Sequence, residues 1–339
     1  MDGPLYLPND ALGITEEQAQ ERVARAKEQW EHYTPEFVGI QAQSLDMTEL
    51  ERQIKATQRV YEKARIGQSE ATVVFRTTSP ITVYTIGDVH YGSVYCDHER
   101  FESDIARIIA TPNCYAVFMS NMIDNAIPSQ YPDGLLVAAT PPDKQAIAMR
   151  KIAMRLNETG RLLGAVTSPC HEGWTYKHTG QDINALIYGF PERRFPVLDN
   201  GGRLTLRVGT VEYLAVVLHQ LGPYNSNFNH THGTKQQQRL VINGEADIVA
   251  AGHHHVGDVE MTYDGTGEHR KIVAYLRTGC YKGVSRIHDQ WSVGRYGSTG
   301  EPSGQAVTLW PNERRMQTYL EFDTAVACHE ALSLLHLTR

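Results

Sequence analysis

Five short apolar runs in this 339-residue chain each end in a polar cluster of metal-ligating residue types, and this recurrence most constrains the fold. The runs have the length and composition of buried β-strands. Ligands bind at the carboxyl ends of strands in α/β sheets, so we expect these clusters to meet at one edge. The clusters supply Asp88 and His90, Asn121 and Asp124, Cys170 to Glu172, His219, and His253 to His255.

Other common catalytic or metal-binding patterns are missing from the sequence. A zinc finger needs paired cysteines, and the chain has no C-x-x-C spacing. A serine hydrolase needs a G-x-S-x-G turn, which is absent. Neither a P-loop nor a dinucleotide-binding fingerprint is present. The fifteen histidines, which include most of the clustered residues, therefore point to a metal site built from several strands.

The composition is that of a globular protein, with 41% hydrophobic and 21% charged residues. The sequence contains no apolar run of membrane-spanning length, so we expect no membrane partner. The net charge of −7 gives no general attraction to nucleic acid. The five cysteines are an odd count without short spacings, and residues 1–10 lack a secretory pattern. These features favour a cytoplasmic protein with reduced thiols.

Residues 1–70 read as a helical N-terminal arm. Thr15 and Gln18 form a capping box, and Ala19, Val23 and Trp30 recur at helical spacing behind it. We expect the arm to pack on the main domain or on a partner subunit. The sequence therefore leaves a homo-oligomer formed through these helices open.

Residues 71–325 form the expected main domain, and residues 326–339 a C-terminal tail. Strands and helices alternate in the first half, and several strands follow closely in the second, which indicates an α/β protein with more than one sheet. Helices are expected at 101–109 and 143–158. Strands are expected at 71–76, 81–86, 115–119, 163–167, 204–208, 213–218, 246–251, 273–277, 305–309 and 317–322.

The order of the clusters resembles the calcineurin-like metallophosphoesterase superfamily over about residues 80–325. The family pattern is D-x-H, then G-D-x-x-D, then G-N-H-D/E, then a lone histidine, then G-H-x-H. Three of these elements are intact here, as is the histidine–acid half of the third. The matching positions are Asp88 and His90, His171 and Glu172, His219, and Gly252, His253 and His255.

This resemblance implies a four-layer α/β/β/α sandwich of two mixed β-sheets flanked by helices. It implies hydrolysis of a phosphoester by a water molecule that two divalent ions activate. His171 would act as the general acid, with Asp124 or Glu172 orienting it. One ion would be held by Asp88, His90, Asn121 and His255, and the other by Asn121, Cys170, His219 and His253.

Two positions depart from the family pattern. Asn121 stands where the family has an aspartate that bridges both ions, and Cys170 stands where it has an asparagine. A Cys170 thiolate would restore the negative charge that Asn121 lacks, and we hypothesise that the two changes compensate each other. Thiolate ligation favours zinc or iron over magnesium, with manganese as the alternative when Cys170 does not bind. A neutral amide bridges cations poorly, so a site for one ion stays open.

The segment Leu276–Lys282 resembles the ending of phage- and prophage-encoded family members. That similarity favours a phosphodiesterase or nuclease acting on a nucleotide or nucleic acid, in the host cytoplasm if the protein is phage-encoded. A phosphomonoesterase is an alternative. A second class of function is a catalytically degenerate fold that serves as a binding or structural module, for which Asn121 and Cys170 are the sequence support.

Overall fold

The computed structural model describes residues 15–32, 48, 51–52, 54–55, 67–221, 229–267, 270–282 and 304–337. The chain divides into two compact units, Met1–Ala64 and Arg65–Arg339. Each unit is considered by itself below.

The first unit contains helix α1 (Glu16–His32). The expected capping box is present, because the Gln18 amide donates to Thr15 Oγ1 at 3.3 Å and the Thr15 amide donates to Gln18 Oε1 at 3.0 Å. Residues 20–28 of α1 are exposed. Residues 51, 52, 54 and 55 are also helical, but most of the second helix expected in the arm lies outside the described residues.

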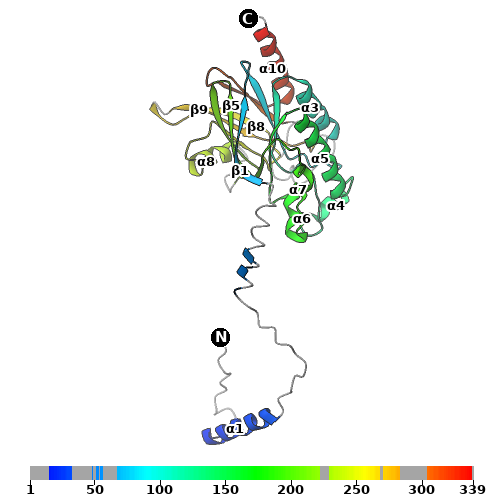
Figure 1. The fold of residues 1–339 in the computed structure, drawn as a ribbon, viewed down its shortest axis with the longest axis vertical. Helices are drawn as coiled ribbons and strands as arrows, with labels where there is room; N and C mark the ends of the chain where they lie inside the picture. The colour runs from blue at the N-terminus through cyan, green and yellow to red at the C-terminus, as the bar shows by residue number, and fades with distance from the viewer. Residues whose placement is uncertain are drawn as a thin grey trace. The chain divides into compact units, whose positions relative to one another are not determined.

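The second unit is a mixed α/β structure (Figure 1). Its helices are α3 (His98–Ala110), α4 (Pro132–Leu136), α5 (Pro142–Glu158), α6 (His171–Thr179), α7 (Ile183–Tyr188), α8 (His232–Leu240) and α10 (Phe322–Leu337). Its strands are β1 (Gly67–Phe75), β2 (Ile81–Ile86), β3 (Cys114–Phe118), β4 (Leu162–Val166), β5 (Val197–Val208), β6 (Val211–Leu218), β7 (Ile248–Ala251), β8 (Asp258–Asp264), β9 (Lys271–Arg277), β10 (Gln305–Leu309) and β11 (Met316–Tyr319). Residues 326–337 of the expected C-terminal tail belong to α10.

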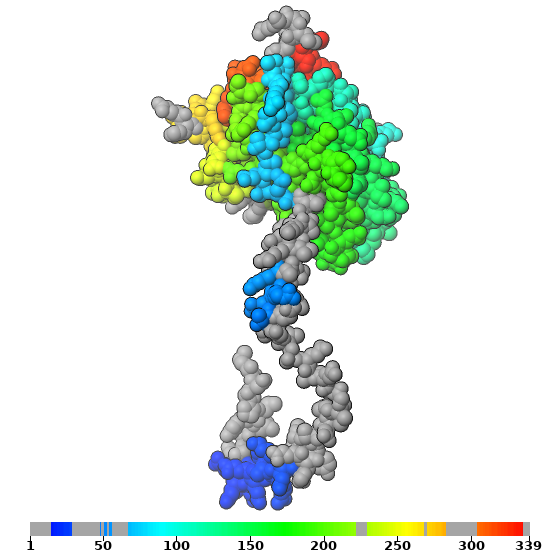
Figure 2. All heavy atoms as spheres, in the orientation of Figure 1, coloured from blue at the N-terminus to red at the C-terminus, as the bar shows by residue number. Residues whose placement is uncertain are grey.

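The strands form one hydrogen-bonded sheet in the order β11-β10-β2-β3-β4-β5-β6-β7-β9-β8. Strand β5 joins its two halves, since Val197 and Leu198 pair with β4 while residues 201–208 pair with β6. The pairs β2–β3, β3–β4, β6–β7 and β7–β9 are parallel, whereas β10–β2 and β5–β6 are antiparallel. Strand β1 pairs with β5 and lies on the surface of the unit (Figure 2).

The buried side chains of the unit form three clusters. In the first, Phe101, Met149 and Phe322 from α3, α5 and α10 pack against Tyr84 and Phe118 of the sheet. The second lies between strands of the two halves and includes Ile81, Val117, Leu206, Tyr213 and Leu276. The third joins Val216, Val249 and Val273 to Ile242, which follows α8. Helices α3 and α5 lie on the opposite side of the strands from α8 (Figure 1).

The sheet brings the sequence clusters to one edge. Strands β2, β3 and β4 are parallel neighbours, and so are β6 and β7, so each set ends on the same side. The loop after β2 continues along the loop after β3, because the amides of Asp88 and His90 donate to the carbonyls of Ser120 and Asn121. Five loops thus converge, and they carry the candidate site.

Candidate metal centre

Backbone strain is concentrated in the convergent loops. Asp88, His90, Ser120, Asn121, His253 and His255 all have φ between 47° and 76°. The other positive-φ residues besides glycine in the described chain are asparagines, which tolerate this region. Strain of this kind costs about 1–3 kcal/mol per residue and clusters at functional sites. The loops therefore hold their side chains in directions that relaxed backbone would not give.

One group of potential metal ligands comprises Asp88, His90 and His255. Their ligand atoms lie within 4.8 Å of one another, and all three residues are buried. His90 Nε2 lies 3.1 Å from His255 Nε2, and Asp88 Oδ1 lies 4.0 and 3.7 Å from these two nitrogens. Four ligands at 2.0–2.1 Å around zinc stand about 3.3–3.4 Å apart, so these separations suit a shared cation.

Asp124 orients the ring of His90. Its Oδ1 lies 3.0 Å from His90 Nδ1, which leaves Nε2 directed at the group. A carboxylate behind a ligating histidine fixes the tautomer of the ring and raises its basicity. His90, Asp124 and His171 also qualify as a ligand group by proximity. However, the Nδ1 atoms of both histidines already meet the carboxylate or carbonyl of Asp124.

A second group comprises Cys170, His219 and His253. His219 Nδ1 lies 2.8 Å from the Met119 carbonyl, so it carries the ring proton of the neutral imidazole. The other nitrogen, Nε2, is buried and has no hydrogen-bond partner among the residues that the structure describes. A buried acceptor without a partner is costly, and a cation between these three residues would satisfy it.

Asp88 and Asn121 connect the two groups. Asp88 Oδ2 accepts a hydrogen bond from the His253 amide at 2.5 Å, and Asn121 Nδ2 donates to Asp88 Oδ1 at 3.0 Å. Gly252 permits this approach, since a side chain there would meet Asp88 Oδ2 at 3.0 Å and His219 Nδ1 at 3.4 Å. The two groups therefore share Asp88 as a common neighbour.

Burial sets the ionisation of the histidines. It lowers the pKa of His219, brings that of His253 to about 4, and lowers those of His90 and His171 well below their usual value. The positive charge of Lys282 is the second cause for His90 and His171. These rings are neutral at pH 7, which is the state in which imidazole binds a metal ion. Burial raises the pKa of Cys170 to about 11, so metal binding would have to displace its proton.

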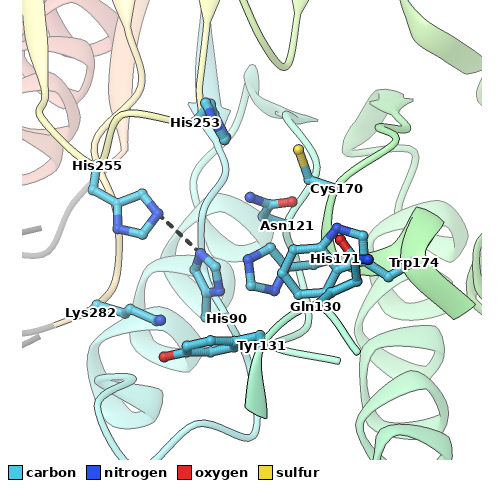
Figure 3. A pocket seen from close by; sticks show the side chains of 10 residues that line it. All are labelled: His90, Asn121, Gln130, Tyr131, Cys170, His171, Trp174, His253, His255 and Lys282. Carbon is cyan, nitrogen blue, oxygen red and sulfur yellow. Dashed lines mark hydrogen bonds between the residues drawn. The ribbon is translucent and has the colours of Figure 1, made fainter. Parts of the chain in front are cut away.

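A cavity of about 230 Å³ opens onto both groups (Figure 3). Tyr131 and Trp174 form an aromatic part of its wall, with ring centroids 6.4 Å apart. Trp174 stacks on His171, whose Nδ1 lies 2.5 Å from the Asp124 carbonyl. The described residues that line it are His90, Asn121, Gln130, Tyr131, Cys170, His171, Trp174, His253, His255 and Lys282.

The carboxylates of the two acidic residues expected to orient His171 form their hydrogen bonds with other groups. Asp124 meets His171 through its backbone carbonyl, while its carboxylate meets His90. Glu172 Oε1 accepts hydrogen bonds from the amides of Met122 at 2.6 Å and Ile123 at 3.4 Å, and Oε2 accepts from Asn121 at 3.2 Å. Burial raises the pKa of Glu172 to about 7, against the effect of these donors. Glu172 therefore holds the loop that carries Asn121.

Sequence reasoning missed Lys282, Tyr131 and Gln130. Lys282 follows β9 at the same sheet edge, so the strand-end rule could have found it if cations had been considered with metal ligands. Tyr131 and Gln130 belong to the segment before α4, and nothing in the sequence connects them to the cavity. His254 is buried beside His253.

The donor set fits divalent metal ions. Imidazole nitrogens, one thiol and one carboxylate are the ligands of zinc and iron sites. The second group in addition has the buried Nε2 of His219, for which the described residues supply no hydrogen-bond partner. The first group has its nitrogen and oxygen atoms at ligand-like separations.

Comparisons with known proteins give only distant structural similarity. No protein-family model matches the chain, and no curated protein does. Vacuolar protein sorting 29 from Cryptosporidium parvum has 13% identity and a TM-score of 0.35, over 72% of this chain and 100% of its own. Nuclease MPE from Pseudomonas putida has 11% identity and a TM-score of 0.29, over 70% and 87% of the two chains. A metallophosphoesterase from Sphaerobacter thermophilus has 10% identity and a TM-score of 0.31, over 71% of this chain and 88% of its own.

Membrane-spanning helices were sought in the described residues as well. None of their helices combines the length and the apolar character that crossing a bilayer requires.

Proposed function

We propose that this protein is a metal-dependent phosphoester hydrolase. The observation that carries the proposal is the buried Nε2 of His219, which has no hydrogen-bond partner among the described residues and belongs to a ligand group beside a second group at Asp88. Both groups border one cavity that also contains His171. Paired cation sites next to a proton donor are the arrangement of metal-assisted phosphoryl transfer.

Each ligand group would hold one divalent ion, and Asn121 would contribute its amide oxygen between them. When bound, the ions supply positive charge for phosphoryl oxygens and lower the pKa of water. Asn121 Oδ1 lies 3.5 Å from the hydroxyl of Ser168, and Nδ2 faces Asp88. A half-turn of the amide would exchange these atoms and direct the oxygen to the first group. The Cys170 thiolate makes zinc or iron(II) our choice of metal, with manganese as the alternative.

His171 would protonate the leaving oxygen. The Asp124 carbonyl accepts a hydrogen bond from Nδ1 and fixes the ring, so Nε2 is the nitrogen that exchanges the proton. Burial and Lys282 lower the pKa of His171 in the protein alone. The negative charge of a bound phosphoryl group opposes both effects and would raise the pKa, because an anion stabilises the imidazolium. Stacking on Trp174 limits rotation of the ring.

Among phosphoesters we favour a phosphodiester, as in a nucleotide or nucleic acid. Tyr131 and Trp174 are half-buried in the cavity wall, and aromatic rings beside a phosphate site can stack on bases. A phosphomonoesterase is the alternative, because the cavity of about 230 Å³ also accommodates a terminal phosphate.

The proposal also covers the family to which the chain belongs and the layered architecture of its fold. The ordered motifs resemble calcineurin-like metallophosphoesterases, with phage-encoded members as the nearest type. Three apolar clusters, one between the two halves of the sheet and one on each outer side, support four layers of the order α/β/β/α. Strand β5 would then be the strand at which the chain passes from one half of the sheet to the other.

Metal analysis and hydrolysis assays test the function. Protein purified without chelator should contain about two equivalents of metal, or one if Asn121 fails to bridge, and should hydrolyse bis-p-nitrophenyl phosphate faster than p-nitrophenyl phosphate. His171→Ala should lose activity and keep its metal, whereas His178→Ala, on the exposed end of α6, is the matched control that should keep both. Faster hydrolysis of the monoester would replace the diesterase by the monoesterase. Activity that survives in His171→Ala would contradict the assigned site.

A catalytically degenerate binding module is the second candidate. It is favoured by Asn121, whose amide stands hydrogen-bonded to Asp88 where the family has a bridging carboxylate. This candidate predicts binding of phosphate or nucleotide without hydrolysis at any added metal. Turnover that His171→Ala abolishes would exclude it.

A further inference from the structure

Lys282 is buried beside the candidate metal groups, which is unusual for a lysine. It is 3% exposed, and its backbone is tied to the site by neighbouring contacts. The Tyr281 amide donates to the Asp88 carbonyl, and Lys282 forms a β-bridge with Cys96. The Asp97 amide donates to the Tyr281 carbonyl at 2.7 Å. The main chain thus fixes the position from which the side chain extends.

The ammonium group of Lys282 reaches the cavity (Figure 3). Its Nζ lies 3.5 Å from Asp124 Oδ1 and 5.7 Å from the centre of the Tyr131 ring. Asp124 Oδ1 is also the atom that meets His90 Nδ1, so the carboxylate is shared. Of the described residues that line the cavity, Lys282 is the one lysine or arginine.

A cation in this position adds to the positive charge of bound metal ions, and the Asp124 carboxylate that offsets it is shared with His90. With metal bound, Asp88 and a Cys170 thiolate would each carry one negative charge in the two ligand groups, and Asn121 adds none. With divalent ions bound, the cavity would therefore carry an excess of positive charge next to the Lys282 ammonium. Buried like charges raise the free energy of the site, and a bound oxyanion lowers it.

We propose that Lys282 is the anion-binding residue of the cavity and donates to a phosphoryl oxygen that the metal ions do not hold. The inference rests on the proposed function for the identity of the anion. Lys282 would contact the substrate itself, next to His171, whose ring lines the same cavity. It also follows that phosphate and metal bind cooperatively, because each reduces the charge imbalance that the other leaves.

Binding of inorganic phosphate tests this role without an activity assay. Titration calorimetry on metal-loaded wild type, Lys282→Met and Lys282→Arg measures the phosphate affinity, and elemental analysis measures the metal content. We expect Lys282→Met to bind phosphate about 10- to 100-fold more weakly, as for loss of a charged hydrogen bond, and to keep its metal. Lys282→Arg should recover most of the affinity, and in kinetics Lys282→Met should raise KM.

Lys235→Met is the matched control, because it removes another lysine–carboxylate pair away from the cavity. Lys235 Nζ lies 2.5 Å from Glu260 Oε1, and neither residue lines the cavity. This variant should bind phosphate like the wild type. If Lys282→Met fails to fold, Lys282→Gln takes its place with the same expected loss.

The outcomes separate this inference from the proposed function. Unchanged phosphate affinity in the Lys282 variants, with metal retained, overturns the role of Lys282 and leaves the metal-dependent hydrolase intact. Phosphate binding that depends on Lys282 in a protein that takes up no metal supports the inference and contradicts the hydrolase. A wild type that binds no phosphate with or without metal overturns the inference.

Discussion

The two ligand groups differ in how many contacts the rest of the protein makes with their potential ligand atoms. In the group of Asp88, His90 and His255, every member is buried and the two Nε2 atoms lie 3.1 Å apart. In the group of Cys170, His219 and His253, the thiol is half-buried and its Sγ lies 3.7 Å from Gln220 Oε1. His219 Nε2 has no partner among the described residues.

This difference separates an ordered site from an adaptable one. In the first group, Asp124 holds the ring of His90 and Asp88 lies beside His255, so we expect an ion to bind there without rearrangement of the ligands. The second group includes a residue whose protonation changes on binding, since the thiol pKa is about 11 in the protein alone. We therefore expect the second group to bind its ion more weakly at low pH and to select thiophilic metals.

The largest effect is expected from Asp88→Asn, because Asp88 contacts both groups. Loss of its charge should release both ions and reduce activity by more than the roughly 10–100-fold typical of a supporting residue. Elemental analysis and hydrolysis of bis-p-nitrophenyl phosphate measure these effects. Asp143→Asn, an exposed change on α5, is the control. If Asp88→Asn retained two ions, the two groups would not depend on Asp88 as a shared residue, which would contradict this prediction.

The next effect separates the groups from each other. His90→Asn should remove the ion of the first group and His219→Asn that of the second, so each variant should retain about one equivalent if two bind in the wild type. Zinc should be the ion that His219→Asn loses, because Cys170 belongs to that group. Loss of both ions from either variant would mean that the groups form one cooperative centre.

Acid should destabilise the metal-free protein. An unfolded histidine takes up a proton near pH 6.5, whereas the buried ones do not, so stability falls as pH drops below that value by about 1.4 kcal/mol per unit for each. The window reaches to about pH 4 for His253. Glu172 and Asp104 act in the opposite direction, since burial raises their pKa to about 7 and about 6. The histidines outnumber them: His90, His171, His219 and His253.

Thermal unfolding with chelator between pH 7.5 and 5 measures the net slope. The stability of His219→Asn should fall less steeply with pH than that of the wild type, because this variant has one buried histidine fewer. A melting temperature that stays constant over this range, or identical slopes for the two proteins, would contradict buried neutral histidines.

The smallest expected effect comes from Asn121→Asp. A carboxylate there would face Asp88 Oδ1 at the 3.0 Å now spanned by a hydrogen bond, which should destabilise the metal-free protein by about 1–3 kcal/mol. Chemical denaturation measures this cost. The double variant Asn121→Asp with Cys170→Asn restores the family's ligand set and should shift preference from zinc towards manganese. If the single change raises metal affinity and activity without a penalty, Cys170 does not compensate for Asn121.

Much of the site was predictable because a strand-end rule applies to it. Apolar runs in the sequence are followed directly by Asp88, His90, Asn121, His219 and His255. Parallel pairing of the strands brings such positions together independently of the loop conformations. The structure brings six of the seven predicted ligand residues into the two groups, and the seventh, Asn121, lines the cavity.

The contacts between loops were not predictable in this way. Glu172 was expected at His171 and instead accepts amides from the Asn121 loop. The direction of each side chain depends on positive-φ residues, and the sequence does not mark which aspartate or histidine adopts them. Tyr131 reaches the cavity through a segment that carries no strand-end signal.

The sequence alone determined the chemical inventory and its order along the chain: imidazoles, carboxylates, one amide and one thiol, each after an apolar run. It also determined the cap of α1, because a capping box needs only residues three positions apart. The tertiary structure decided which atoms remain for a ligand. Met119, one hundred residues earlier, takes His219 Nδ1, and Nε2 has no partner within the described part of the chain. Lys282 enters the cavity because β9 ends beside β7. These contacts join residues that are far apart in the sequence, so local residue patterns do not predict them.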